Sequence, residues 1–200
     1  MEKNRIEAFS DGVIAILITI MVLDLRPPHD DTLQGLQPLW PIFFSYLLSF
    51  VYLAIYWNNH HHLFQAVKHI KGKVLWANLH LLFWLSLLPF ATAWSGENHF
   101  SELPVALYGV VLFFSAVSFN ILTKVLLSVH GKDSTLAKAL GKDFKGKISL
   151  IIYGLAIPLA FHSSYLALML YTLVAILWLV PDSRIEKHFW RKDEDHPHMK

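Results

Sequence analysis

Cysteine is absent from the 200 residues. The chain therefore has no disulfide framework, no zinc thiolate site and no thiol nucleophile. Charge is scarce as well: 16% of the residues are charged, against about 25% in an ordinary soluble domain. The net charge is only +2 and basic residues have a topological use in membranes, so no nucleic-acid partner is expected.

Hydrophobic residues make up 54% of the chain, and they form long runs that carry almost no charge. A helix that crosses a bilayer needs about 20 mostly apolar residues, with about 17 to 25 tolerated. The last long run is interrupted by His162-Ser163-Ser164 and is read as two short spans. The six predicted spans are residues 9–25, 39–57, 75–94, 105–129, 148–161 and 165–180.

The distribution of lysine and arginine gives the predicted orientation, because these residues favour the cytoplasmic side of a membrane. With six spans and an internal N-terminus, the internal segments hold the basic clusters and the external loops hold only Arg26. Merging the last two spans would move the basic tail outside. The sequence thus predicts an all-α, multi-pass membrane domain over residues 1–181, a charged cytoplasmic tail over residues 182–200, and both termini in the cytoplasm.

Ser10 and Asp11 lie just inside the first span. An acidic residue within the membrane boundary is costly unless it is paired, so Asp11 is a functional candidate. The alternative is that the two residues simply anchor the start of a helix. His60 and Asn78 belong to span ends on the same side of the membrane, so a buried cluster with Ser10 and Asp11, and with Arg5 at its rim, is topologically possible. Such a cluster would hold the first helix in place.

Helical geometry separates this acid from an apolar edge of the same helix. At about 100° per residue, Ile16, Thr19 and Leu23 fall within a sector of about 60°, and Asp11 is predicted to face away from them, towards neighbouring helices. Two readings of this edge stay open on geometry alone. It lines an open path, or it packs against another helix.

Neither a metal site nor an active site is predicted. The consecutive histidines His60, His61 and His62 would point in different directions on a helix, whereas metal ligands on a helix sit three or four residues apart. A hydrolase built on Ser10 is disfavoured because Ser10 and Asp11 face different ways and no Gly-x-Ser-x-Gly motif occurs. We therefore expect no enzyme, no catalytic residue and no cofactor.

Three motifs carry a resemblance to a known family. They are, in order, Arg5-x-x-x-Phe9-Ser10-Asp11, then Trp57-x-x-His60 with Leu63-Phe64, then Asn78-Leu79 with Leu88-Pro89. In combination they resemble the lysosomal and prokaryotic potassium channels called transmembrane protein 175. The motifs cover Arg5 to Pro89, a little under half of the chain.

The resemblance implies a six-helix subunit, unlike the usual potassium channels, and a prokaryotic homotetramer in the plasma membrane. It also implies a pore lined by the first helix, with rings of large apolar side chains at Ile16 and Leu23 and a hydroxyl ring at Thr19. The remaining motif residues would form a structural polar network: Arg5, Phe9, Ser10, Asp11, Trp57, His60 and Asn78.

The hypothesis from sequence is therefore passive flux of monovalent cations, potassium above all, through a pore with apolar constrictions that act as a hydrophobic gate. The potassium ion is a permeant ion here and not a cofactor. Two alternatives stay open. One is a secondary transporter in which Asp11 binds a proton or sodium ion, although no internal repeat is visible. The other is a non-conducting structural or sensory membrane protein whose basic loop touches anionic lipid.

Overall fold

The computed structural model describes residues 2–67, 69–131, 134, 137 and 143–179, so the predicted tail over 182–200 lies outside the described residues. The described part is helical and contains no strand. Its elements are α1 (Lys3–Leu23), the 3-10 helix η1 (Gln34–Leu39), α2 (Trp40–Gln65), α3 (Gly72–Ser86), α4 (Leu88–Glu97), α5 (Glu102–His130), α7 (Phe144–Ala160) and α8 (Ser164–Leu179).

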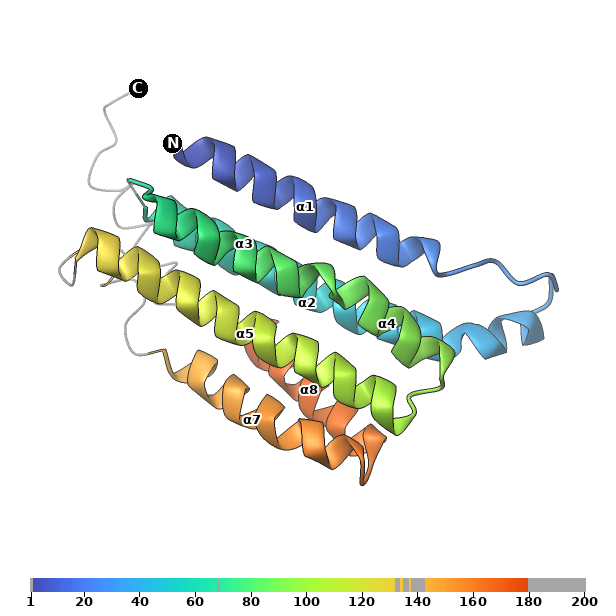
Figure 1. Cartoon of the computed structure of the whole chain (residues 1–200). Helices are drawn as coiled ribbons and strands as arrows, with labels where there is room; N and C mark the ends of the chain where they lie inside the picture. The colour runs from blue at the N-terminus through green and yellow to red at the C-terminus, as the bar shows by residue number, and fades with distance from the viewer. Residues whose placement is uncertain (1, 68, 132–133, 135–136, 138–142, 180–200) are drawn as a thin grey trace, which may run out of the picture.

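The helices lie side by side in one bundle (Figure 1). Helix α1 lies along one edge and packs on α2, α3 and α4, while α5 contacts α3, α4, α7 and α8. Helices α3 and α4 follow one another along nearly one line and act as a single segment (Figure 1). The predicted all-helical fold of six apolar segments is confirmed over the described residues.

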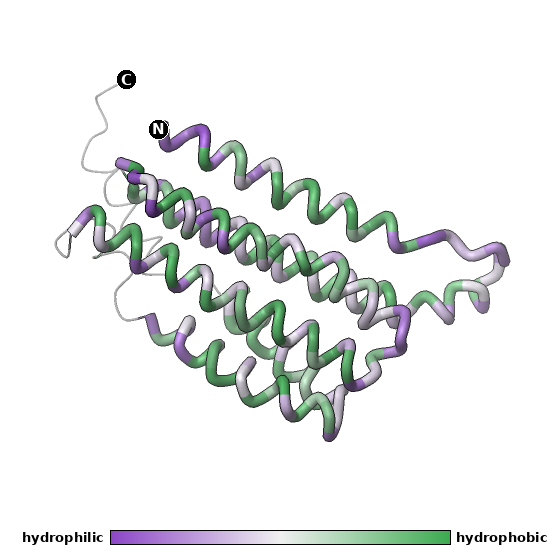
Figure 2. Tube along the Cα trace, in the orientation of Figure 1, coloured by the Kyte–Doolittle hydropathy of each residue, from purple (hydrophilic) through white to green (hydrophobic). Residues whose placement is uncertain are grey.

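Four segments of the described chain are long and apolar enough to cross a membrane: Lys3–Leu23, Gln34–Gln65, Gly72–Glu97 and Glu102–His130. Helices α7 and α8 are shorter, with 17 and 16 residues, and they form a hairpin at Phe161–Ser163, where the sequence predicted a break. Apolar residues run along most of each helix, and hydrophilic residues gather towards the helix ends (Figure 2).

Several helix boundaries differ from the expected spans, and two of these differences affect the motif residues. Helix α2 continues past Trp57 to Gln65, so the histidine run lies on the helix and not after it. The third segment is broken at Leu87, between α3 and α4. Pro89 accounts for the break, because it has no N–H with which to bond the carbonyl of Leu85 in a continuous helix.

Hydrogen bonds between buried side chains connect the helices in the interior. The Ser49 hydroxyl lies 2.6 Å from that of Thr92 and 2.9 Å from that of Tyr108, which joins α2 to α4 and α5. The Tyr52 hydroxyl donates to the carbonyl of Tyr171 at 2.6 Å, and Tyr153 donates to Tyr52 at 3.1 Å. Inside a membrane such bonds satisfy polar groups that no water reaches, so they tie the α7–α8 hairpin to the rest of the bundle.

Candidate functional site

Helix α1 has one face buried against the bundle. The buried side chains recur every three or four residues, as one face of an α-helix requires. They are Ile6, Ser10, Ile14, Leu17 and Met21. Four of the five are apolar, so this face is fixed by packing, and the single hydroxyl needs a partner inside the bundle.

The opposite face of α1 is unpartnered in the single chain. Phe9, Ile16 and Leu23 are 54%, 57% and 74% exposed, and a side chain added at Gly12 would meet nothing within 4 Å. With the exposed Thr19 these residues form a line, which we call the α1 stripe: Phe9, Gly12, Ile16, Thr19 and Leu23. Their spacing alternates between three and four residues, which keeps their side chains on one edge of the helix.

Thr19 is the one hydroxyl residue in the α1 stripe. Its Oγ1 donates a hydrogen bond to the carbonyl of Ile16 at 2.8 Å. Because the proton is used within the helix, the oxygen lone pairs remain free on the exposed side. A ring of such oxygens around an axis could replace part of the water shell of a cation.

Behind the stripe, three buried side chains form a hydrogen-bonded chain from α1 through α3 to α2. The Asn78 amide donates to the Ser10 hydroxyl at 2.9 Å, and its carbonyl oxygen lies 2.8 Å from Nε2 of His60. Since an amide oxygen only accepts, His60 carries its proton on Nε2. The His60 ring also stacks on Phe64, with centroids 4.4 Å apart. The chain fixes the rotation of α1 relative to α2 and α3.

Asp11 lies outside this buried chain, although the sequence placed it in the same cluster. The Asp11 carboxylate accepts a hydrogen bond at 3.0 Å from Nε1 of Trp57, at the half-exposed boundary of α1 and α2. The Arg5 side chain is exposed, and no hydrogen bond or ion pair joins it to the other described residues. Phe9 was expected in the network but lies on the α1 stripe instead.

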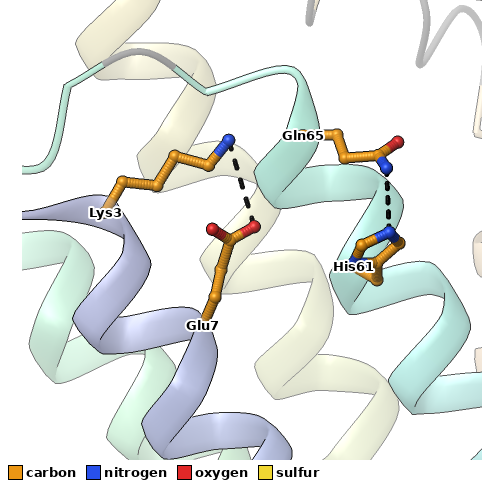
Figure 3. A network of polar contacts seen from close by, with 4 residues as sticks. All are labelled: Lys3, Glu7, His61 and Gln65. Carbon is orange, nitrogen blue, oxygen red and sulfur yellow. Dashed lines mark hydrogen bonds and ion pairs between the residues drawn. The ribbon is translucent and has the colours of Figure 1, made fainter.

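The three consecutive histidines take different surroundings on α2. His60 is buried, whereas His61 accepts a hydrogen bond at 2.8 Å from the amide of Gln65, one turn further along. Figure 3 shows this pair beside the Lys3–Glu7 ion pair of α1, where the two charged atoms lie 3.9 Å apart. Within the described residues, no three His, Asp or Glu side chains could hold a metal ion together.

The structure adds two positions that the sequence reasoning missed. Phe9 was assigned to the network by its motif, and Gly12 was not considered, yet both lie in the α1 stripe. The signal was available in the sequence, because residues 9 and 12 extend the alternating spacing of 16, 19 and 23 by two further turns.

An all-helical bundle of segments long and apolar enough to cross a membrane, in which one helix leaves an apolar edge without a partner, defines a multi-span membrane protein. A model of the family described as "Endosomal/lysosomal potassium channel TMEM175" matches residues 5–89. The chain is 54% identical to "Potassium channel HX13_20290" of Chryseobacterium sp. (strain P1-3), over 94% of the chain and 97% of that protein. The chain belongs to the TMEM175 family.

Two further comparisons extend the likeness along the chain. "Potassium channel B446_29190" of Streptomyces collinus is 31% identical, over 88% of this chain and 91% of that protein. The crystal structure of a lysosomal potassium-selective channel TMEM175 homolog from Chamaesiphon minutus matches with a TM-score of 0.76 at 29% identity. That match covers 90% of this chain and 97% of the other, so it includes the helices beyond the family motifs.

Proposed function

We propose that the protein is a potassium-permeable channel, in which four copies place α1 around one shared pore. The α1 stripe carries the proposal, because it is a continuous apolar edge with one hydroxyl and no partner in the single chain. Relatives that the chain matches over most of their length, from Chryseobacterium and Streptomyces, carry the name potassium channel.

The proposed constrictions are rings of Ile16 and Leu23, with the Thr19 ring between them. Apolar rings gate by excluding water when the pore is narrow, and an ion must lose part of its water shell to pass them. The hydroxyl oxygens of Thr19 would replace some of that water. Potassium gives up its water more readily than sodium does, so such a pore favours potassium modestly.

In this arrangement the residues behind the stripe are structural. Ser10, Asn78 and His60 hold the rotation of α1, and Trp57 turns Asp11 away from the stripe. A network that fixes the helix also fixes the radius of a pore lined by that helix. The proposed mechanism needs no catalytic residue and no cofactor, and the cation takes part only as the permeant ion.

We further propose that the protein lies in a prokaryotic plasma membrane with both termini in the cytoplasm. Basic residues support the orientation: Lys3 and Arg5 lie at the start of α1, and Lys71 and Lys73 at the start of α3. These helix starts share one end of the bundle (Figure 1), whereas Arg26 follows the opposite end of α1, which ends at Leu23. Lysine and arginine favour the cytoplasmic side.

The test is the ionic current through purified protein in planar bilayers, with Ile16→Asn compared with wild type. Asparagine is polar, so we expect it to wet the constriction, raise the single-channel conductance and lower the preference for potassium over sodium. Ile151→Asn on α7 is the matched control, because Ile151 is 61% exposed but lies outside α1. It should leave both quantities unchanged.

The outcomes separate the proposal from its two alternatives. Unchanged currents in Ile16→Asn would contradict the pore assignment. Flux that saturates and needs a counter-ion would indicate a transporter, and no flux from intact protein would indicate a non-conducting membrane protein. Ohmic single-channel steps that respond to Ile16 support the channel.

A further inference from the structure

Two lysines lie on the outer surface of the bundle between α3 and α5, away from the α1 stripe. Lys73 at the start of α3 donates from Nζ to the Ser128 hydroxyl on α5 at 2.6 Å. Lys124 is exposed and precedes Ser128 by four residues, which places it one turn away on the same face of α5. Lys124 is therefore one helical turn from the hydroxyl that Lys73 binds, on the same face of α5.

No carboxylate neutralises this pair in the described part of the chain. Among the described residues an ion pair joins Lys3 to Glu7, which both lie on α1, and neither Lys73 nor Lys124 takes part in it. Lys124 lies six residues before the end of α5, about 9 Å along the helix. A cation at that depth in a membrane normally needs an anionic partner or reaches to the interface.

An aromatic and apolar surface continues from the two lysines towards the middle of the bundle. Trp84 of α3 stacks on Phe114 of α5 with centroids 4.5 Å apart, and this contact and the Lys73–Ser128 bond fix the antiparallel register of the two helices. In that register Trp76, which is 76% exposed, is level with Lys124. The surface beyond it is made of exposed apolar side chains: Phe83, Phe114 and Ile121.

We propose that this surface binds an anionic phospholipid. The phosphate lies between Lys73, Lys124 and the Ser128 hydroxyl, and one acyl chain lies along α3 and α5 over Phe114 and Ile121. A lipid fits better than free phosphate, because the cations border an apolar surface and face no polar cavity. Anionic headgroups lie at the interface where such lysines attract them.

The experiment measures lipid binding to the purified full chain by native mass spectrometry, with phosphatidylglycerol and phosphatidylcholine compared. Wild type should bind phosphatidylglycerol more tightly. Lys124→Gln should weaken that binding about fivefold, and Lys73→Gln with Lys124→Gln about 25-fold. The Lys124 side chain is exposed and no hydrogen bond joins it to the other described residues, so its replacement should not disturb the fold.

Two control variants distinguish a site from general charge effects. Lys3→Gln with Arg26→Gln removes the same charge away from α3 and α5, and it should keep wild-type binding. Lys73→Arg with Lys124→Arg keeps the charge at the site and should also bind. Equal affinity for both lipids, retained affinity in the double glutamine variant, or equal loss in the control would overturn the proposal. Displacement of the lipid by inorganic phosphate at equal ionic strength would show a phosphate site and refute a lipid site.

Discussion

At the scale of single residues, Asn78 of α3 links α1 to α2 through two hydrogen bonds between buried side chains. Its amide donates to Ser10 and its oxygen accepts from His60, and all three side chains are buried. Removing it leaves two buried polar groups without partners. Each such group costs about 1 to 3 kcal/mol in a protein interior, and interhelical bonds within membranes fall at the low end.

We therefore expect Asn78→Ala to lower the free energy of unfolding by about 1 to 3 kcal/mol, measured by denaturation in detergent. Asn59→Ala is the matched control, because the half-buried Asn59 amide bonds, among the residues that the structure describes, only to the carbonyl of Ile55 in its own helix. Its effect should be smaller. Equal losses in the two variants would show that the Asn78 chain does not hold α1.

The sequence predicted part of this residue-level picture. Topology alone brought Ser10, His60 and Asn78 to one end of the bundle, since span ends on the same side meet there. It could not separate Asp11 from that cluster, because the Asp11–Trp57 pair depends on the rotation of α2 about its axis. Phe9 was misplaced for a related reason: a motif records which residues occur together, not which way each one faces.

At the scale of helices, hydropathy located the six segments, because a span must be apolar over most of its length. Hydropathy gave less information about the residue at which a helix ends. Helix α2 runs to Gln65 through the polar residues 58–62, so its backbone hydrogen bonds continue where its hydropathy falls. The break at Leu87 follows from Pro89, which is visible in the sequence. The sequence could not show which helices pack together, because this depends on contacts between side chains that are far apart in the chain.

One such contact is the close approach of α4 to α2. A Cβ added at Gly96 would lie 2.5 Å from the Ser45 hydroxyl and 2.8 Å from the Cα of Ile42. The second atom is backbone, so the helices must move apart. Gly96→Ala should therefore destabilise the protein by about 1 to 3 kcal/mol.

Gly154→Ala is the control for Gly96→Ala, and the stability of both variants is measured by thermal unfolding in detergent. A Cβ at Gly154 meets only Phe113, at an ordinary 3.9 Å. Alanine also favours the helix over glycine by about 1 kcal/mol, so this variant should be neutral or more stable. A stable Gly96→Ala protein would mean that α2 and α4 are not in close contact.

At the scale of the whole molecule, the α1 stripe gains a function only when several copies share an axis. The absence of cysteine makes that assembly testable, because a single introduced thiol has no background. In Leu23→Cys the thiols of all copies should converge at one level of the pore. Several thiolates at one point bind soft metal ions strongly, so Cd²⁺ should block the current of this variant and a chelator should restore it.

Ile151→Cys is the control, because Ile151 is also largely exposed in the single chain, at 61% against 74% for Leu23, but belongs to α7. In a bundle with α1 at the centre, the α7 thiols of different copies lie far apart and cannot share an ion. Block of both variants would indicate a general effect of thiols, and block of neither would place Leu23 away from the axis. Block of Leu23→Cys alone means that the exposed edge of α1, apolar in every copy, meets its counterparts around the conduction path.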